Sequence, residues 1–287
     1  MKSIKRKSEV LLLLIVLLIV AIKFYNAQPD KNAVNIDISG DLRVHFIDVG
    51  QADSTLIELP DGKNMLIDAG NNDDGNFVVD YIENLGISKL DFVVGTHPHE
   101  DHIGGLDDVI NAFDVGSVYM PKVQTNTKTF HDVLQAVKNN GLSVKTAKAG
   151  VVLAQNEDYS LYMLAPVSAE YEEINNYSAV IRLEYKDTAF LFTGDAEEVS
   201  ESEILENVQA DVLKVGHHGS SSSTTPEFLL RVNPVYAYIP CGKDNSYGHP
   251  HRETLKHLNE SGVEIYRADT DGTVIFVSDG NRIGVVK

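Results

Sequence analysis

Short apolar runs separated by polar turns fill the chain beyond residue 40. Runs of this length that are rich in Val, Ile, Leu and Phe are typical of strands. The pattern predicts strands over 42–49, 54–59, 64–68, 90–96, 118–120, 142–146, 159–164, 179–185, 188–192, 211–215, 235–240, 263–267, 273–277 and 282–286.

Between these runs, apolar residues recur with the spacing of amphipathic helices. The pattern predicts helices over 77–85, 103–113, 129–139, 196–206, 225–232 and 252–261. Hairpins of strands mixed with covering helices indicate an α+β fold, an αββα sandwich in which two packed mixed sheets carry helices outside.

The first segment has a different pattern. Basic residues precede an uninterrupted apolar run over 10–22, which is shorter than the roughly 20 residues of a full membrane span. We expect a signal peptide or short signal anchor over 1–27, a linker over 28–40 and one folded domain over 41–287. The domain would then lie outside the cytoplasmic membrane, anchored or secreted. A buried core helix is the less favoured alternative, because every face of the run is apolar.

Charge narrows the class of partner. The formal net charge is −18, and residues 28–287 carry 19 basic against 41 acidic residues. Such a body offers no broad electrostatic surface for nucleic acid. The single cysteine, Cys241, excludes an internal disulfide framework and a cysteine-rich zinc module.

The densest chemistry follows the strand predicted over 90–96. His97, His99, Asp101 and His102 fall within six positions, and imidazole and carboxylate groups are ligands that zinc and its neighbours accept. His97 and His99 can share one metal, while Asp101 and His102 can reach a second. The alternative is a polar turn in which histidines cluster without a ligand.

The spacing His-x-His-x-Asp-His resembles that of the metallo-β-lactamase superfamily. Further stretches resemble it in order: 66–70, 192–195 and the pair His217-His218. More narrowly, 46–54, 214–220, 247–250 and 270–272 are similar to the hydrolase domain of ComEC-type DNA-uptake proteins. Secreted teichoic-acid phosphorylcholine esterases are similar in the histidine cluster and the histidine pair.

The resemblance implies two metal ions, with zinc expected first and manganese as the alternative. It implies that Asp195 bridges them, that His217 or His218 completes the second site, and that Asp68 orients a ligand imidazole. Two such metals would hold a bridging hydroxide as the nucleophile.

Each assignment has an alternative. Asp195 could cap the following helix, and Asp68 could simply end a strand. His249 could bind substrate, donate a proton to the leaving group, or shape its loop. The loop 220–223 is expected to be solvated, with phosphate contact as the alternative. Asp101 and His249 are the candidate catalytic residues.

One departure from the superfamily pattern stands between the two motifs. Many members carry a further ligand histidine before the bridging aspartate, where this chain has Asn175-Asn176-Tyr177-Ser178. His131 is no substitute, because it lies at a predicted helix start. The first metal is therefore expected to have fewer protein ligands.

Together these features predict a membrane-anchored or secreted metal-dependent hydrolase, a phosphodiesterase or nuclease acting on DNA or another phosphodiester. A cell-wall teichoic-acid phosphodiesterase and a β-lactamase are rival enzymes. A metal-binding accessory subunit docking on a separate membrane channel is the rival from another class. A single apolar segment argues against a DNA translocator acting alone.

Overall fold

Two β-sheets packed face to face form the centre of the fold in the computed structural model, which describes residues 41–287. The first sheet has the order β17-β16-β1-β2-β3-β5-β7-β8. Its strands are β1 (Leu42–Phe46), β2 (Ser54–Glu58), β3 (Asn64–Ala69), β5 (Phe92–Val94), β7 (Val118–Met120), β8 (Val144–Thr146), β16 (Val274–Ser278) and β17 (Ile283–Val286).

The second sheet has the order β15-β14-β13-β12-β11-β10-β9. Its strands are β9 (Val152–Gln155), β10 (Tyr159–Ala165), β11 (Val180–Tyr185), β12 (Thr188–Phe192), β13 (Val212–Lys214), β14 (Tyr236–Ile239) and β15 (Glu264–Arg267). The short strands β4 (Lys89–Leu90) and β6 (Asp114–Val115) pair with each other.

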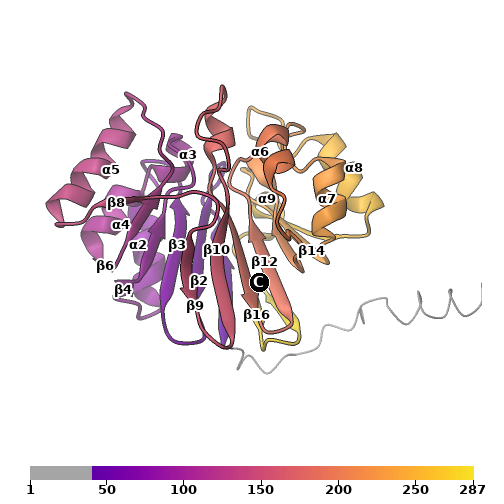
Figure 1. Cartoon of the computed structure of the whole chain (residues 1–287), viewed down its shortest axis with the longest axis horizontal. Coiled ribbons are helices and arrows are strands. Elements are labelled where there is room, and N and C mark those ends of the chain that lie inside the picture. Colours follow the sequence, from indigo (N-terminus) through magenta and orange to yellow (C-terminus); the bar gives the residue numbers. More distant parts are fainter. Residues whose placement is uncertain (1–40) are drawn as a thin grey trace, which may run out of the picture. The chain divides into compact units, whose positions relative to one another are not determined.

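Helices cover the outer face of each sheet, as Figure 1 shows. The helices are α2 (Gly75–Asn84), α3 (Glu100–Ile103), α4 (Leu106–Ala112), α5 (Lys128–Asn139), α6 (Glu198–Glu203), α7 (Pro226–Val232), α8 (Arg252–Glu260) and α9 (Ala268–Asp271), with 3-10 turns η1 (Ile174–Tyr177) and η2 (Gly216–Gly219). The predicted sandwich of two mixed sheets flanked by helices is confirmed.

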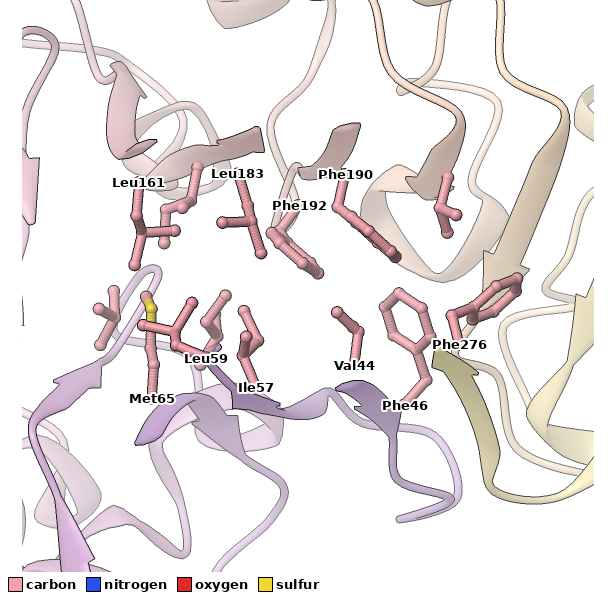
Figure 2. Packing of buried hydrophobic residues seen from close by; sticks show 14 of the residues in the cluster. Val44, Phe46, Ile57, Leu59, Met65, Leu161, Leu183, Phe190, Phe192 and Phe276 are labelled. Atoms are coloured by element: carbon pink, nitrogen blue, oxygen red, sulfur yellow. The ribbon is translucent and has the colours of Figure 1, made fainter. Parts of the chain in front are cut away.

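The inner faces of the two sheets meet in an apolar core. Phe46 of β1 stacks on Tyr238 of β14 at a centroid distance of 4.6 Å and meets Phe276 edge-on at 5.7 Å. Figure 2 shows Phe190 and Phe192 of β12 facing Val44, Ile57 and their neighbours across this layer. Each aromatic pair adds about 0.5–1.5 kcal/mol beyond its area burial, so the core fixes how the sheets align.

The parallel strands of both sheets determine where the candidate residues lie. β3, β5, β7 and β8 run parallel in the first sheet, and β12, β13, β14 and β15 do so in the second. Ligands of open α/β sheets bind beyond the carboxyl ends of parallel strands. Asp68 lies at the carboxyl end of β3, and the segments after β5, β12, β13 and β14 carry the remaining candidate residues.

Several sequence-based boundaries need correction. The helix predicted over 103–113 begins earlier, as α3 at Glu100, and is interrupted at Gly104-Gly105 before α4. A Cβ on Gly104 would stand 2.2 Å from the carbonyl carbon of Asn71, so only glycine lets the chain pass the loop after β3 this closely. The edge strand β9 and the one-turn helix α9 were not predicted.

The expected signal segment 1–27 and the expected linker 28–40 both lie outside the described residues. Within residues 41–287, no helix is both long and apolar enough to cross a bilayer.

Candidate metal centre

One carboxylate oxygen lies at the centre of the candidate site. Oδ2 of Asp195 is 3.2 Å from Nε2 of His102, 3.6 Å from that of His218, 3.8 Å from that of His217 and 3.9 Å from that of His97. Asp195 and His97 belong to loops of different sheets, so the site is assembled where the two sheets meet.

The remaining residues of the histidine cluster lie beside these four rings. Nδ1 of His99 is 3.0 Å from Nε2 of His97. Oδ2 of Asp101 is 3.1 Å from Nε2 of His218 and 4.0 Å from that of His102. All seven side chains that were predicted to be metal ligands therefore lie together.

The backbone after β13 explains how two adjacent histidines reach one carboxylate. His217 and His218 both have positive φ angles, 49° and 52°, which are uncommon for residues other than glycine. Their rings consequently diverge, with planes at 66° and centroids 6.1 Å apart. The sequence analysis expected either His217 or His218 to be a metal ligand. In the structure, the Nε2 atoms of both residues lie within 4 Å of Asp195.

Each of the four imidazoles is held by its other nitrogen. Nδ1 of His102 is 2.8 Å from Oδ2 of Asp68, and Nδ1 of His218 is 2.8 Å from the carbonyl of Pro240. Nδ1 of His217 is 3.3 Å from Glu197, and that of His97 is 3.3 Å from the Ser178 hydroxyl. Such outer partners fix the tautomer and present the opposite nitrogen to a metal.

Asp68 is itself fixed by Thr96. Its two carboxylate oxygens accept hydrogen bonds at 2.7 Å from the backbone N–H and from the hydroxyl of Thr96. Asp68 lies in the left-handed region with φ 59°, and its carboxylate contacts both Thr96 and His102.

Asp53 and Lys214 form a buried ion pair beside the histidines, and sequence reasoning gave neither a role. Nζ of Lys214 also donates to the carbonyl of Gly194 at 2.7 Å, and Oδ1 of Asp53 lies 3.4 Å from Nδ1 of His218. Both residues occur in the stretches 46–54 and 214–220 that carry the family resemblance. Their place in these motifs could have indicated a role in the site.

Electrostatics favour a cation at this place. Burial alone would raise the pKa of Asp195, but the imidazoles of His102, His218 and His97 lower it well below its usual range. Burial would lower the pKa of His102, but Asp195 and three further aspartates raise it well above its usual value. The site thus concentrates carboxylate charge that a dication would balance.

Two buried atoms test whether a metal fits. Within the described residues, neither Nε2 of His102 nor Oδ1 of Asp195 has a hydrogen-bond partner. An unpaired buried acceptor or donor is costly, and a coordinated ion would satisfy both atoms. Triads of mutually close donor atoms occur at His97, His102 and Asp195, and at Asp101, His102 and His218. The donor set therefore fits a metal of the zinc type.

A pocket of about 320 Å³ opens beside these residues. It is lined by Gln51, His99, Glu100, Asp101, Asp195, His217, His218, Tyr247 and His249. Tyr247 is 69% exposed, and its ring stacks on that of His249 at a centroid distance of 5.7 Å.

His249 is oriented by Gln51. Oε1 of Gln51 accepts from the backbone N–H of Gly242 at 2.9 Å, so its amide nitrogen faces Nδ1 of His249 at 3.4 Å as a donor. Burial, with His217, His218 and His251, lowers the pKa of His249 to about 4. The neutral ring then carries its proton on Nε2 and can donate a hydrogen bond to a substrate oxygen.

Two other sequence alternatives are corrected. Asp195 does not cap α6, because Oδ1 of Asn176 accepts from the backbone N–H of Glu197 at 3.3 Å and of Ser200 at 3.1 Å. The loop 220–223 is only partly solvated, since Ser220 and Ser223 are buried.

Comparison with known proteins agrees with this geometry. The family model described as the metallo-beta-lactamase superfamily matches residues 47–243. ComE operon protein 3 of Bacillus subtilis is 32% identical over 267 residues, which cover 86% of this chain and 34% of that protein. Recombination protein 2 of Haemophilus influenzae is 30% identical over 230 residues, 77% of this chain and 27% of that protein. The chain thus spans about a third of these relatives.

A solved structure shows the same fold at low identity. The metallo-beta-lactamase fold protein YhfI of Bacillus subtilis has a TM-score of 0.52 and 14% identity, covering 81% of this chain and 98% of that one. The curated relatives are competence-related proteins of the ComEC type, as the motifs predicted.

Proposed function

The chain belongs to the metallo-β-lactamase superfamily, and from this membership we propose that it is a metal-dependent phosphodiesterase whose first candidate substrate is DNA. The observation that carries the proposal is the convergence of four imidazole nitrogens on Oδ2 of Asp195 beside an open pocket. Zinc is the first candidate metal, and manganese the second.

The metals would be held by the seven residues His97, His99, Asp101, His102, Asp195, His217 and His218. When bound, such metals acidify water and withdraw charge from a phosphoryl oxygen. The chain itself keeps the ligand rings in place, because Asp68 holds His102 and Pro240 holds His218 from the side opposite Asp195.

The pocket supplies groups suited to a phosphodiester. The Nε2–H of neutral His249 can donate to a phosphate oxygen, and a bound anion would raise the pKa of the ring toward proton donation. Tyr247 offers an exposed aromatic face at the pocket wall. Bases of single-stranded nucleic acid stack on such faces without sequence preference.

The relatives' names favour DNA over other phosphodiesters, since they refer to competence and recombination. We further propose that residues 1–27 place the domain outside the cytoplasmic membrane. The acidic body limits electrostatic attraction, so binding would rest on the metals and on stacking rather than on a basic surface.

The test uses the full chain purified with zinc, and in parallel with manganese. Single-stranded DNA, teichoic acid and a chromogenic cephalosporin are incubated with it side by side. Cleavage of DNA that stops on chelation and returns with added metal is the expected result. Cleavage of teichoic acid or cephalosporin alone would contradict the DNA assignment. No turnover at full metal occupancy would indicate the accessory role instead.

A further inference from the structure

The segment Asn175–Ser178 has no histidine where the superfamily pattern places one. The side chains of Asn176 and Ser178 instead form hydrogen bonds within the protein. Asn176 accepts hydrogen bonds from the start of α6. Ser178 accepts from the backbone N–H of Asp195 at 3.0 Å and contacts Nδ1 of His97. The side of the site next to His97 therefore needs a donor from another element.

His217 lies in position to supply that donor. Its Nε2 is 3.8 Å from Oδ2 of Asp195, which matches the 3.9 Å of His97. His217 and His99 both line the pocket, as do Asp101 and His218, whereas His97 and His102 are fully buried.

A carboxylate holds His217 from the opposite side. Oε1 of Glu197 is 3.3 Å from Nδ1 of His217, and it accepts from the hydroxyl of Ser222 at 2.9 Å and from the amide of Asn175 at 3.3 Å. The same Nδ1 atom is 3.2 Å from the Ser222 hydroxyl and 3.4 Å from the Asn175 amide nitrogen. A carboxylate that fixes one imidazole nitrogen while the other faces outward is the usual arrangement behind a metal-bound histidine.

His218 belongs to a different group of ligands. Its Nε2 lies 3.1 Å from Asp101, and Asp101, His102 and His218 form one triad of mutually close donor atoms. Its Nδ1 is held by the carbonyl of Pro240 rather than by Glu197. The two adjacent histidines thus share Asp195 on the Nε2 side, but they differ in their Nδ1 partners, and His218 alone also contacts Asp101.

We infer that His217 replaces the missing imidazole, so that one metal is held by His97, His99, His217 and Asp195 and the other by Asp101, His102, His218 and Asp195. Each metal then has four protein donors of the nitrogen and oxygen types that zinc accepts. The inference rests on the metal-dependent function proposed above.

Cobalt(II) binding to the full chain tests the assignment, with bound metal measured after gel filtration and by the visible spectrum during titration. The variants are His217→Asn, His99→Asn and His218→Asn, with His131→Asn on the exposed face of α5 as control. Asparagine tolerates the positive φ of residues 217 and 218, so backbone strain does not confuse the comparison. Circular dichroism of the metal-free proteins checks folding.

Wild type and His131→Asn should bind two equivalents. His217→Asn and His99→Asn should each lose the same equivalent and leave the same spectrum, and combining them should remove nothing more. His218→Asn should lose the other equivalent. Glu197→Gln, which keeps the ligand itself, should weaken only the equivalent lost in His217→Asn, by about 10–100-fold.

Two results would overturn the inference. His217→Asn could keep both equivalents at wild-type affinity, which would make His217 a substrate-contacting residue. It could also reproduce the spectrum of His218→Asn, which would place both histidines on one metal. A wild type that binds no metal would instead overturn the proposed function, so the two failures are distinguishable.

Discussion

Nδ1 of His102 lies 2.8 Å from Oδ2 of Asp68, and both side chains are almost completely buried. The contact joins the end of β3 to α3, and it fixes the ring whose Nε2 is nearest to Asp195. Asp68 thus acts on the site through His102 and not by direct contact with Asp195.

Replacing Asp68 by asparagine should lower metal affinity about 10–100-fold, because the amide removes the charge that orients His102 while tolerating φ 59°. Competition with a chromophoric chelator measures the affinity. Asp73→Asn, in the loop after β3, is the control. Equal affinity in the Asp68 variant and wild type would show that the contact is structural only.

Asp101→Ala should lower hydrolysis of bis(p-nitrophenyl) phosphate about 100- to 10,000-fold, because metal catalysis contributes several kcal/mol to the barrier. Initial rates at saturating metal measure the effect. Asp132→Ala, on the exposed face of α5, should retain wild-type rates. An unchanged rate in the Asp101 variant would contradict metal-dependent hydrolysis at this site.

Lys214→Met should destabilise the metal-free protein by about 3–5 kcal/mol, because it removes the nearest cation from the buried carboxylate of Asp53. Urea unfolding measures the loss. The double variant with Asp53→Asn should recover part of the stability, since it removes the uncompensated charge. A double variant less stable than Lys214→Met alone would contradict this account.

Glu201 should make stability depend on pH. Burial raises the pKa of this carboxyl from 4.5 to about 7, despite hydrogen bonds from Thr224 and Thr225. The folded protein therefore binds the proton of Glu201 more tightly than the unfolded chain does. The resulting contribution to the unfolding free energy is complete below pH 4.5 and is lost as the pH rises through 7. Relative to Glu201→Gln, the wild type should lose about 3 kcal/mol of unfolding free energy between pH 4.5 and 7. If the difference in unfolding free energy between wild type and Glu201→Gln does not change with pH, the pKa of Glu201 is not raised.

Tyr247→Ala should weaken binding of single-stranded DNA by about 1–3 kcal/mol, the value of one stacked base, and Tyr247→Phe should not. Fluorescence anisotropy of a labelled oligonucleotide in the presence of metal measures the affinity. Equal losses in both variants would indicate that the hydroxyl, and not the ring, contacts the substrate.

The core strands were predictable because local pattern determines them. The strand predicted over 188–192 is β12 without change, and α5 begins only one residue before its predicted start. Apolar runs bounded by turn residues carry this information within a few positions. The edge strand β9 lacks it, because Val152 is 56% exposed and the strand depends on pairing with β10.

The grouping of the candidate ligands was predictable from the motifs, but of their outer partners only Asp68 was predicted. Asp53 and Lys214 are far apart in sequence, and only the packing of the two sheets joins them. In the sequence, Glu197 is an ordinary acidic residue before a helix. Its contact with His217 depends on the positive φ angles of His217 and His218, which direct the His217 ring toward it. Those angles belong to non-glycine residues, so no local signal announces them.

The division of the candidate ligands between two sheets has a genetic consequence. Loops after β5 and after β12 and β13 supply the donors, so the centre exists only while the two sheets keep their alignment. A screen for lost metal content would therefore recover substitutions at Phe46 and Phe192 as well as at the histidines, although those rings bear no donor atoms. Core variants and ligand variants would share one phenotype, and only the stability of the metal-free protein would separate them.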